Sequence, residues 1–169
     1  AEPRTIEEAV REVTRPGCAR VLAGGTDLLV RLKHGDWAVD RVVNLKKIEG
    51  LSAITDEGAR GVTIGALATI AALAKSDTIA RRFPLLIEAA VRMASPQVRC
   101  LATVGGNLCN ASPAADMAPP LMVLGASLRI AGPGGARELA IDRFFTGPGS
   151  CALAAGEILT HIHLPASTG

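Results

Sequence analysis

Aromatic residues are nearly missing from this sequence of 169 residues: they make up 2% of it, and tyrosine does not occur. The core must therefore be built from Ala, Val, Leu and Ile, and almost no aromatic surface is left on which nucleic-acid bases could stack. A large excess of one charge is missing too, because 18 basic and 16 acidic residues leave a net charge of +2. No run of basic residues alternates with aromatics, so we expect no nucleic acid as a partner.

Long apolar runs are also missing. The stretch 117–126 is interrupted by Pro119, Pro120 and Gly125, and it is too short to cross a bilayer. The N-terminus begins Ala1-Glu2 and lacks the basic segment followed by an apolar one that marks a signal peptide. These features predict a chain without a membrane span and with a cytoplasmic location.

The cysteine spacing lacks the pattern of a metal site or of a dithiol pair. None of the four cysteines forms a C-x-x-C pair or has a histidine at ligand spacing; they are Cys18, Cys100, Cys109 and Cys151. This spacing favours buried or loop thiols in a reducing compartment over a metal or redox role. We therefore expect no metal site.

Two common nucleotide-binding motifs, the Walker loop and the G-x-G-x-x-G fingerprint, are missing as well. What the chain has instead is a glycine pair in each of two short polar segments between apolar runs, at 21–28 (VLAGGTDL) and 103–108 (TVGGNL). Glycine permits a positive φ angle and lets an anion approach bare N–H groups. Two such loops predict one shared ligand.

The first of these segments has two interpretations. Strand-like residues 19–23 precede the glycines and Leu28 begins a helical pattern, so Thr26 or Asp27 could simply cap the helix. The alternative is an anion bound at the same helix start.

The second segment continues into an irregular polar stretch, 109–116, before an apolar helix. Thr103 and Asn107 can donate hydrogen bonds to phosphate or carbonyl oxygens, whereas an ionised Asp116 can only accept them and so suits sugar hydroxyls. This mixture of donors and acceptors fits a dinucleotide better than a lone phosphate.

The hydrophobic pattern predicts one small α+β unit in which helices pack on a sheet. A capping box at Thr5 and Glu8 predicts a first helix that ends before Pro16. Further helices are expected from 28, at 69–74 and at 84–93, and strands at 19–23, 41–45, 62–66, 127–131 and 158–164.

These segments together resemble the flavin motifs of molybdenum hydroxylase flavoproteins, a family that includes carbon monoxide dehydrogenase medium subunits and xanthine dehydrogenase flavin domains. Residues 23–28 (AGGTDL) are similar to its first motif. Residues 96–99 (PQVR), 103–107 (TVGGN) and 112–116 (SPAAD) are similar to its second. The end of its FAD domain resembles residues 144–145, 156–159 and 162–165.

The resemblance implies a two-lobed, PCMH-type α+β domain that binds FAD. It implies a small N-terminal α/β lobe, 1–56, and a larger lobe with an antiparallel sheet and helices, 57–169. Because the chain stops just after the last strand of that domain, the family's C-terminal domain is expected to be absent.

The resemblance also implies which residues contact FAD. In the first loop they are Leu22, Ala23, Gly24, Gly25, Thr26, Asp27 and Leu28, with Asp27 capping loop N–H groups rather than facing the pyrophosphate. On the phosphate, ribityl and sugar side they are Thr103, Gly105, Gly106, Asn107 and Asp116. Around the isoalloxazine they are Leu108, Cys109, Leu159 and Met93. Cys109 stands where xanthine dehydrogenases have an aliphatic residue, which favours a packing role for its thiol.

The implied function is electron relay, in which FAD collects electrons from iron–sulfur clusters and passes them to an external acceptor. The clusters and the molybdenum cofactor would lie on partner chains, an iron–sulfur subunit and a large subunit, because this chain has ligands for neither. No side chain is expected to act as an acid or base. Two alternatives stay open at this point, a flavin- or nucleotide-binding module without turnover and a stand-alone flavin reductase.

Overall fold

The first helix begins as its capping box predicts. In the computed structural model, which describes residues 1–166, α1 spans Ile6–Thr14. The Thr5 hydroxyl accepts a hydrogen bond from the Glu8 N–H at 3.1 Å, and the Glu8 carboxylate accepts one from the Arg4 N–H at 2.8 Å. The first bond satisfies an N–H group that a helix start leaves free, and the second joins the residue before the cap to the first turn.

A parallel strand pair follows α1. Strand β1 (Ala19–Leu22) pairs with β2 (Arg41–Asn44), and α2 (Leu28–His34) forms the connection between them. Parallel strands need such a crossover because the chain must return to the same end of the sheet. The glycine-rich segment 23–27 lies at the carboxyl end of β1, where the strand passes into α2.

The larger sheet has five strands in the order β3-β4-β9-β5-β6, and every pairing in it is antiparallel. Its strands are β3 (Ile54–Asp56), β4 (Val62–Gly65), β5 (Ser127–Gly132), β6 (Gly135–Ala140) and β9 (Ile158–Leu164). Ile162 of β9 pairs with Ile64 on one side and Leu128 on the other, and all three side chains are fully buried. The chain's last described strand therefore forms the centre of the sheet.

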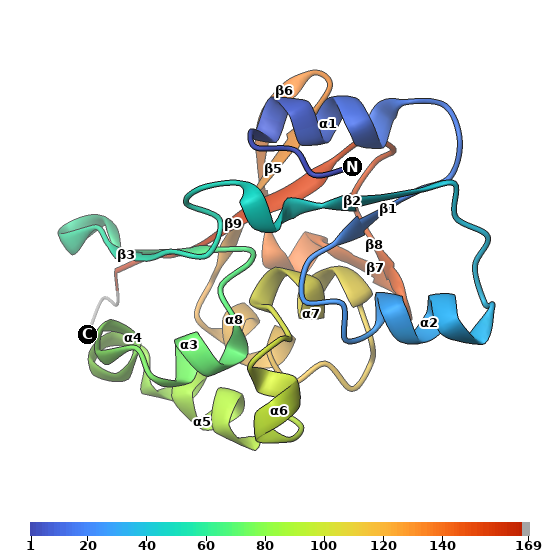
Figure 1. Cartoon of the computed structure of the whole chain (residues 1–169). Helices are drawn as coiled ribbons and strands as arrows, with labels where there is room; N and C mark the ends of the chain where they lie inside the picture. The colour runs from blue at the N-terminus through green and yellow to red at the C-terminus, as the bar shows by residue number, and fades with distance from the viewer. Residues whose placement is uncertain (167–169) are drawn as a thin grey trace.

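Short helices gather on one side of the molecule, drawn in green at the bottom of Figure 1, while α1 lies at the top. The remaining helices are α3 (Ile70–Ala74), α4 (Asp77–Arg82), α5 (Pro84–Arg92), α6 (Pro96–Arg99), α7 (Val104–Asn110) and α8 (Ala118–Val123). Three 3-10 turns and a short ladder complete the path: η1 (Leu45–Lys47), η2 (Gly58–Arg60), η3 (Ile141–Arg143), β7 (Phe145–Gly147) and β8 (Ser150–Cys151). Among residues 1–166, no helix is long and apolar enough to span a bilayer.

The predicted mixture of helices and an antiparallel sheet is confirmed, but the second glycine segment is not the loop that the sequence predicted. Residues 104–110 form α7, and the two glycines lie in its first turn. The Thr103 hydroxyl caps this helix by accepting from the Gly106 N–H at 3.1 Å. This cap offsets the low helix propensity of two successive glycines. Helices α4 and α6 and strand β6 were also not predicted.

Two clusters of buried side chains form the core. The larger one joins the five-stranded sheet to α3–α8, and its members include Ile64, Leu86 and Leu128. The smaller one joins α1 to β2, and it also contains Leu67 and Ile158. Strand β3, just before the predicted lobe boundary at residue 56, pairs with β4 in the larger sheet. The division into lobes at 56 stays a prediction, and Ser167–Gly169 of the larger lobe lie outside the described residues.

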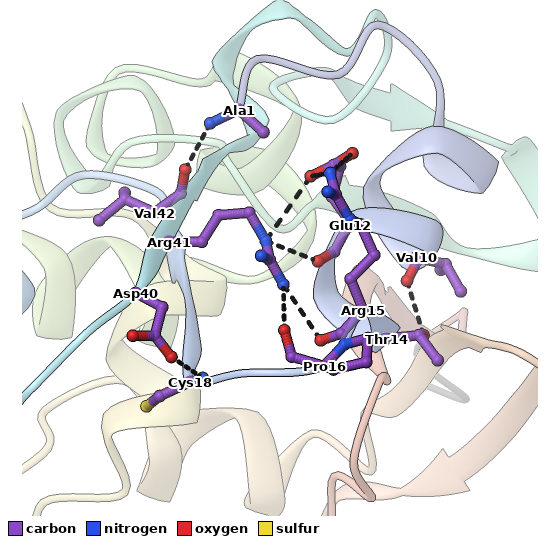
Figure 2. A network of polar contacts seen from close by, with 10 residues as sticks. All are labelled: Ala1, Val10, Glu12, Thr14, Arg15, Pro16, Cys18, Asp40, Arg41 and Val42. Carbon is purple, nitrogen blue, oxygen red and sulfur yellow. Dashed lines mark hydrogen bonds and ion pairs between the residues drawn. The ribbon is translucent and has the colours of Figure 1, made fainter.

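Arg41 ties β2 to the end of α1, as Figure 2 shows. Its guanidinium donates to the carbonyl oxygens of Glu12 and Arg15, each at 3.1 Å, and lies 3.6 Å from the Glu12 carboxylate. The Asp40 carboxylate accepts from the Cys18 N–H at 2.7 Å and so holds the start of β1. The two Arg41 bonds satisfy carbonyl groups that the helix end leaves free.

We expect Arg41→Ala to lower the free energy of unfolding by about 1.5–3 kcal/mol, because two charge-assisted hydrogen bonds to helix-end carbonyls are lost. The matched control is Arg15→Ala, which removes an exposed ion pair with Glu12 worth about 0–1 kcal/mol. Urea unfolding of both variants measures the difference. Equal losses in the two variants would contradict this role for Arg41.

Candidate functional site

The two glycine segments meet, and in each of them one glycine leaves no room for a side chain. A Cβ atom added to Gly24 would lie 2.0 Å from the carbonyl oxygen of Leu101. One added to Gly105 would lie 2.6 Å from the Cβ of Ala66. Gly24 and Gly105 therefore serve the fold, because backbone packs directly against backbone or Cβ at these positions.

Backbone hydrogen bonds hold the second segment in this place. The Gly105 N–H donates to the Ala66 carbonyl at 2.9 Å, and the Val104 N–H donates to the Ala68 carbonyl at 3.0 Å. The Ile70 N–H donates back to the Ala102 carbonyl at 2.9 Å. The start of α7 is thus fixed to the segment between β4 and α3.

All four glycines line a cleft of about 740 Å³, and of the two outside these close contacts, Gly106 is the one with open space beside it. Gly25 has a φ angle of +82°, which favours glycine. A Cβ on Gly106 would meet, among the described residues, only the Thr103 hydroxyl at 2.7 Å and the Ala23 Cβ at 3.9 Å within 4 Å. The cleft is of the size usual for ligand sites.

Most of the predicted FAD contacts line this one cleft: Ala23, Gly24, Gly25, Thr26, Asp27, Leu28, Met93, Thr103, Gly105, Gly106, Asn107, Cys109 and Leu159. Three predicted residues do not line it. Leu22 lies in β1, Leu108 is a fully buried residue of α7, and Asp116 is exposed in the segment before α8. Direct contact of any of these residues with FAD stays a prediction.

The lining also contains residues that were not predicted from the sequence, among them Arg20, Arg31, Trp37 and Leu153–Ile158. Single arginines and a single tryptophan carry no periodic pattern, so only the folded chain reveals that they share a cleft.

Residues 1–167 match the family described as "FAD binding domain in molybdopterin dehydrogenase". The chain belongs to this family. The "Xanthine dehydrogenase FAD-binding subunit" of Escherichia coli O157:H7 is 36% identical to it over 161 residues, covering 95% of this chain and 55% of the relative. The "Carbon monoxide dehydrogenase medium chain" of Afipia carboxidovorans is 38% identical over 164 residues, covering 96% of this chain and 57% of the relative.

The fold is shared as well. The structure of carbon monoxide dehydrogenase from Hydrogenophaga pseudoflava superposes with a TM-score of 0.95 at 32% identity, covering 99% of this chain and 58% of that one. The chain thus spans little more than half the length of the relatives it matches. These comparisons confirm the predicted family, the α+β fold class and FAD as the cofactor.

An unpartnered polar atom in the cleft suits this family's cofactor. The side-chain oxygen of Asn107 is buried and has no hydrogen-bond partner among the described residues. A buried acceptor left alone costs about 1–3 kcal/mol, so a ligand that donates to it is expected. The hydroxyls of a ribityl chain are such donors, and Asn107 lines the cleft beside Gly106.

Asp27 does not have the role predicted for it. It precedes α2, but its side chain makes no capping hydrogen bond, and its backbone is helical, with φ −100° and ψ −53°. A capping side chain needs the extended backbone that Thr103 shows, with φ −112° and ψ 154°. Among the described residues, the Asp27 side chain therefore caps no helix N–H group. Thr69, in contrast, caps α3 by accepting from the Ala72 N–H at 3.1 Å.

Cys109 lies in the cleft wall as a neutral thiol. Burial raises its pKa to about 12, and the nearby Cys151 thiol adds to the effect. All four cysteines are free, and Cys18 and Cys100 are exposed. Among residues 1–166, no group of three or more His, Cys, Asp and Glu side chains is placed to hold a metal ion.

An ion pair holds the wall formed by residues 152–157. Arg137 donates to both carboxylate oxygens of Glu157 at 2.7 Å and to the Ala152 carbonyl at 2.9 Å. Glu157 also accepts from the Ala154 N–H at 2.7 Å. The hydrogen bond from Arg137 lowers the pKa of Glu157, so its charge is compensated within the wall.

Substitution of the two α7 glycines is expected to have different effects, a loss of stability at Gly105 and a loss of FAD affinity at Gly106. Gly105→Ala should destabilise the chain by about 1–3 kcal/mol, because the new methyl overlaps the Ala66 backbone. In Gly106→Ala the weakened Thr103 cap costs about 1 kcal/mol. Removing a helix glycine returns about 0.5–1 kcal/mol. Its fold should therefore persist.

The added methyl of Gly106→Ala points into the cleft, so FAD affinity should fall about tenfold, a loss of about 1.4 kcal/mol. Thermal unfolding and fluorescence titration with FAD measure the two effects. Normal FAD affinity in folded Gly106→Ala would contradict the placement of the cofactor.

The thiol reactivity of the native chain should follow exposure and pKa. Iodoacetamide at pH 8 should modify Cys18 and Cys100 and leave Cys109 unmodified, because a thiol of pKa about 12 holds almost no thiolate there. Peptide mass spectrometry locates the labels, and labelling in denaturant, where all four cysteines should react, is the control.

The same thiol makes stability depend on pH. Its pKa rises from an ordinary 9.0 to about 12 on folding, so the unfolded chain releases the proton first. The stabilisation is complete below pH 9 and is lost as the pH rises toward 12. Cys109→Val keeps the volume and has no proton to release, so it should lose less stability than the wild-type chain between pH 8 and 10. Equal losses in the two chains would show that the thiol is ionised in the native cleft.

Proposed function

We propose that this chain is the FAD-binding part of an electron-transfer flavoprotein subunit of a molybdenum hydroxylase-type oxidoreductase. The observation that carries the proposal is the convergence of both glycine segments on one cleft that also holds the unpartnered oxygen of Asn107. The family membership supports it, because the relatives are named as FAD-binding subunits and medium chains of dehydrogenases.

Each part of the cleft suits one part of FAD in this proposal. Gly25 and Thr26 bind the pyrophosphate through bare N–H groups and a hydroxyl, and Asn107 accepts from the ribityl chain. Met93, Cys109 and Leu159 pack on the isoalloxazine and exclude water from it. FAD itself supplies the redox chemistry, so none of these side chains has to act as an acid or base.

The source and the destination of the electrons lie outside this chain. The proposed donor is an iron–sulfur subunit, which receives electrons from a large subunit that carries the molybdenum cofactor and oxidises the substrate. The proposed acceptor is external. We further propose that the complex is cytoplasmic and that the FAD site is formed between lobes divided near residue 56.

Reconstitution with FAD tests the binding part of the proposal. After gel filtration the purified chain should retain stoichiometric FAD with the absorbance bands of oxidised flavin. Gly106→Ala, which should fold but bind less tightly, is the matched variant. A wild-type chain that folds and remains colourless would overturn the assignment and favour a module without flavin.

Reduction kinetics test the relay part. FAD on the chain should be reduced rapidly only when the reduced iron–sulfur subunit is added, and the two subunits should co-elute. Rapid oxidation of a pyridine nucleotide by the chain alone would identify a stand-alone flavin reductase instead.

A further inference from the structure

Two arginines and the only tryptophan of the chain form a cluster in the cleft wall. The guanidinium carbon of Arg20 lies 4.6 Å from the centre of the Trp37 ring, and that of Arg31 lies 4.8 Å from it. Arg20 comes from β1, Arg31 from α2, and Trp37 from the segment between α2 and β2. We call Arg20, Arg31 and Trp37 the arginine–tryptophan cluster.

The positive charge of this cluster is not balanced by an ion pair. Among residues 1–166, neither Arg20 nor Arg31 lies within 4 Å of a carboxylate oxygen. The acidic residues that line the cleft are Asp27 and Glu157. Glu157 is already paired with Arg137, so two guanidinium charges face a single carboxylate, that of Asp27.

Such an arrangement favours a bound anion. Each cation–π contact attracts a guanidinium to the ring face, and Trp37 thus orders two side chains that would otherwise repel each other. Ordered guanidinium groups bind phosphate oxygens with two parallel hydrogen bonds. The cluster is therefore preorganised for a phosphate-bearing ligand.

The cluster comes from the part of the chain that flanks the first glycine segment, where the pyrophosphate is proposed to bind. Its residues lie in β1, in α2 and just after α2, and the Gly24–Thr26 segment connects β1 to α2. The apolar residues Met93 and Leu159 come instead from the end of α5 and from β9. A dinucleotide can therefore place a charged half and an apolar half on different walls.

We propose that Arg20 and Arg31, held by Trp37, bind the ADP half of FAD and make the site prefer the dinucleotide to riboflavin. This inference rests on the proposed function, since it takes FAD as the occupant of the cleft. It assigns the charge of the diphosphate to two side chains, in addition to bare N–H groups.

Trp37 reports directly on this interaction, because the chain has one Trp and no Tyr. ADP, which carries no flavin ring, should change the Trp37 emission of the apo chain in a saturable way that weakens as salt rises. Arg20→Gln and Arg31→Gln should each lower the affinity for ADP and for FAD about tenfold and leave riboflavin affinity unchanged. Asp27→Asn, which removes the opposing charge and no capping bond, should tighten FAD binding.

The matched control is Arg60→Gln. Arg60 lies in η2, its side chain is 81% exposed, and it does not line the cleft, so the same loss of charge should alter no affinity. If a Gln variant fails to fold, Arg20→Lys or Arg31→Lys keeps the charge without the planar group, and its ADP affinity should still fall.

The outcomes separate the two proposals. A wild-type chain that binds neither FAD nor riboflavin overturns the proposed function. Unchanged FAD and ADP affinity in both Gln variants, with normal FAD binding by the wild type, overturns this inference alone. A loss of riboflavin affinity as large as that of FAD would make the arginines structural and would also overturn it.

Discussion

The cleft depends on a close approach of backbone segments that only glycine permits. Gly24 packs against the carbonyl of Leu101, and Gly105 packs against Ala66. These two contacts join the strand pair β1–β2, the start of α7 and the segment after β4. A side chain at either position would separate the walls by the width of a methyl group. The same approach leaves Gly106 facing the space between the walls, so packing and ligand access come from one arrangement.

The charges around the cleft follow a consistent division. The wall at 152–157 carries no unbalanced charge, because Arg137 and Glu157 neutralise each other and also bind backbone groups. The thiol of Cys109 stays neutral through burial. Positive charge without an ion pair remains only at Arg20 and Arg31 among the lining residues described. A flavin that carries its own redox chemistry needs such a surface for binding and orientation, not for proton transfer.

Local patterns in the sequence predicted a ligand site at the two glycine pairs, a helix start at Thr5 and strands at the short apolar runs. The resemblance of 23–28 and 103–107 to flavin motifs identified the family and its cofactor, and the comparisons confirm both. Local pattern was insufficient for 104–110, which looked like a loop. Its helix depends on the Thr103 cap and on hydrogen bonds to Ala66 and Ala68, which lie far away in the sequence.

The sequence by itself determined the family, the fold class, the cofactor and the part of the cleft lining that the two glycine segments form. Tertiary structure alone decided which of the glycines approach another backbone segment, that Asp27 makes no capping bond among the described residues, and that Arg20, Arg31 and Trp37 share one surface. The physical reason is the range of the interactions. Propensity, capping and motif spacing act over a few residues, whereas close backbone approach and cation–π contact join segments whose separation no sequence pattern records.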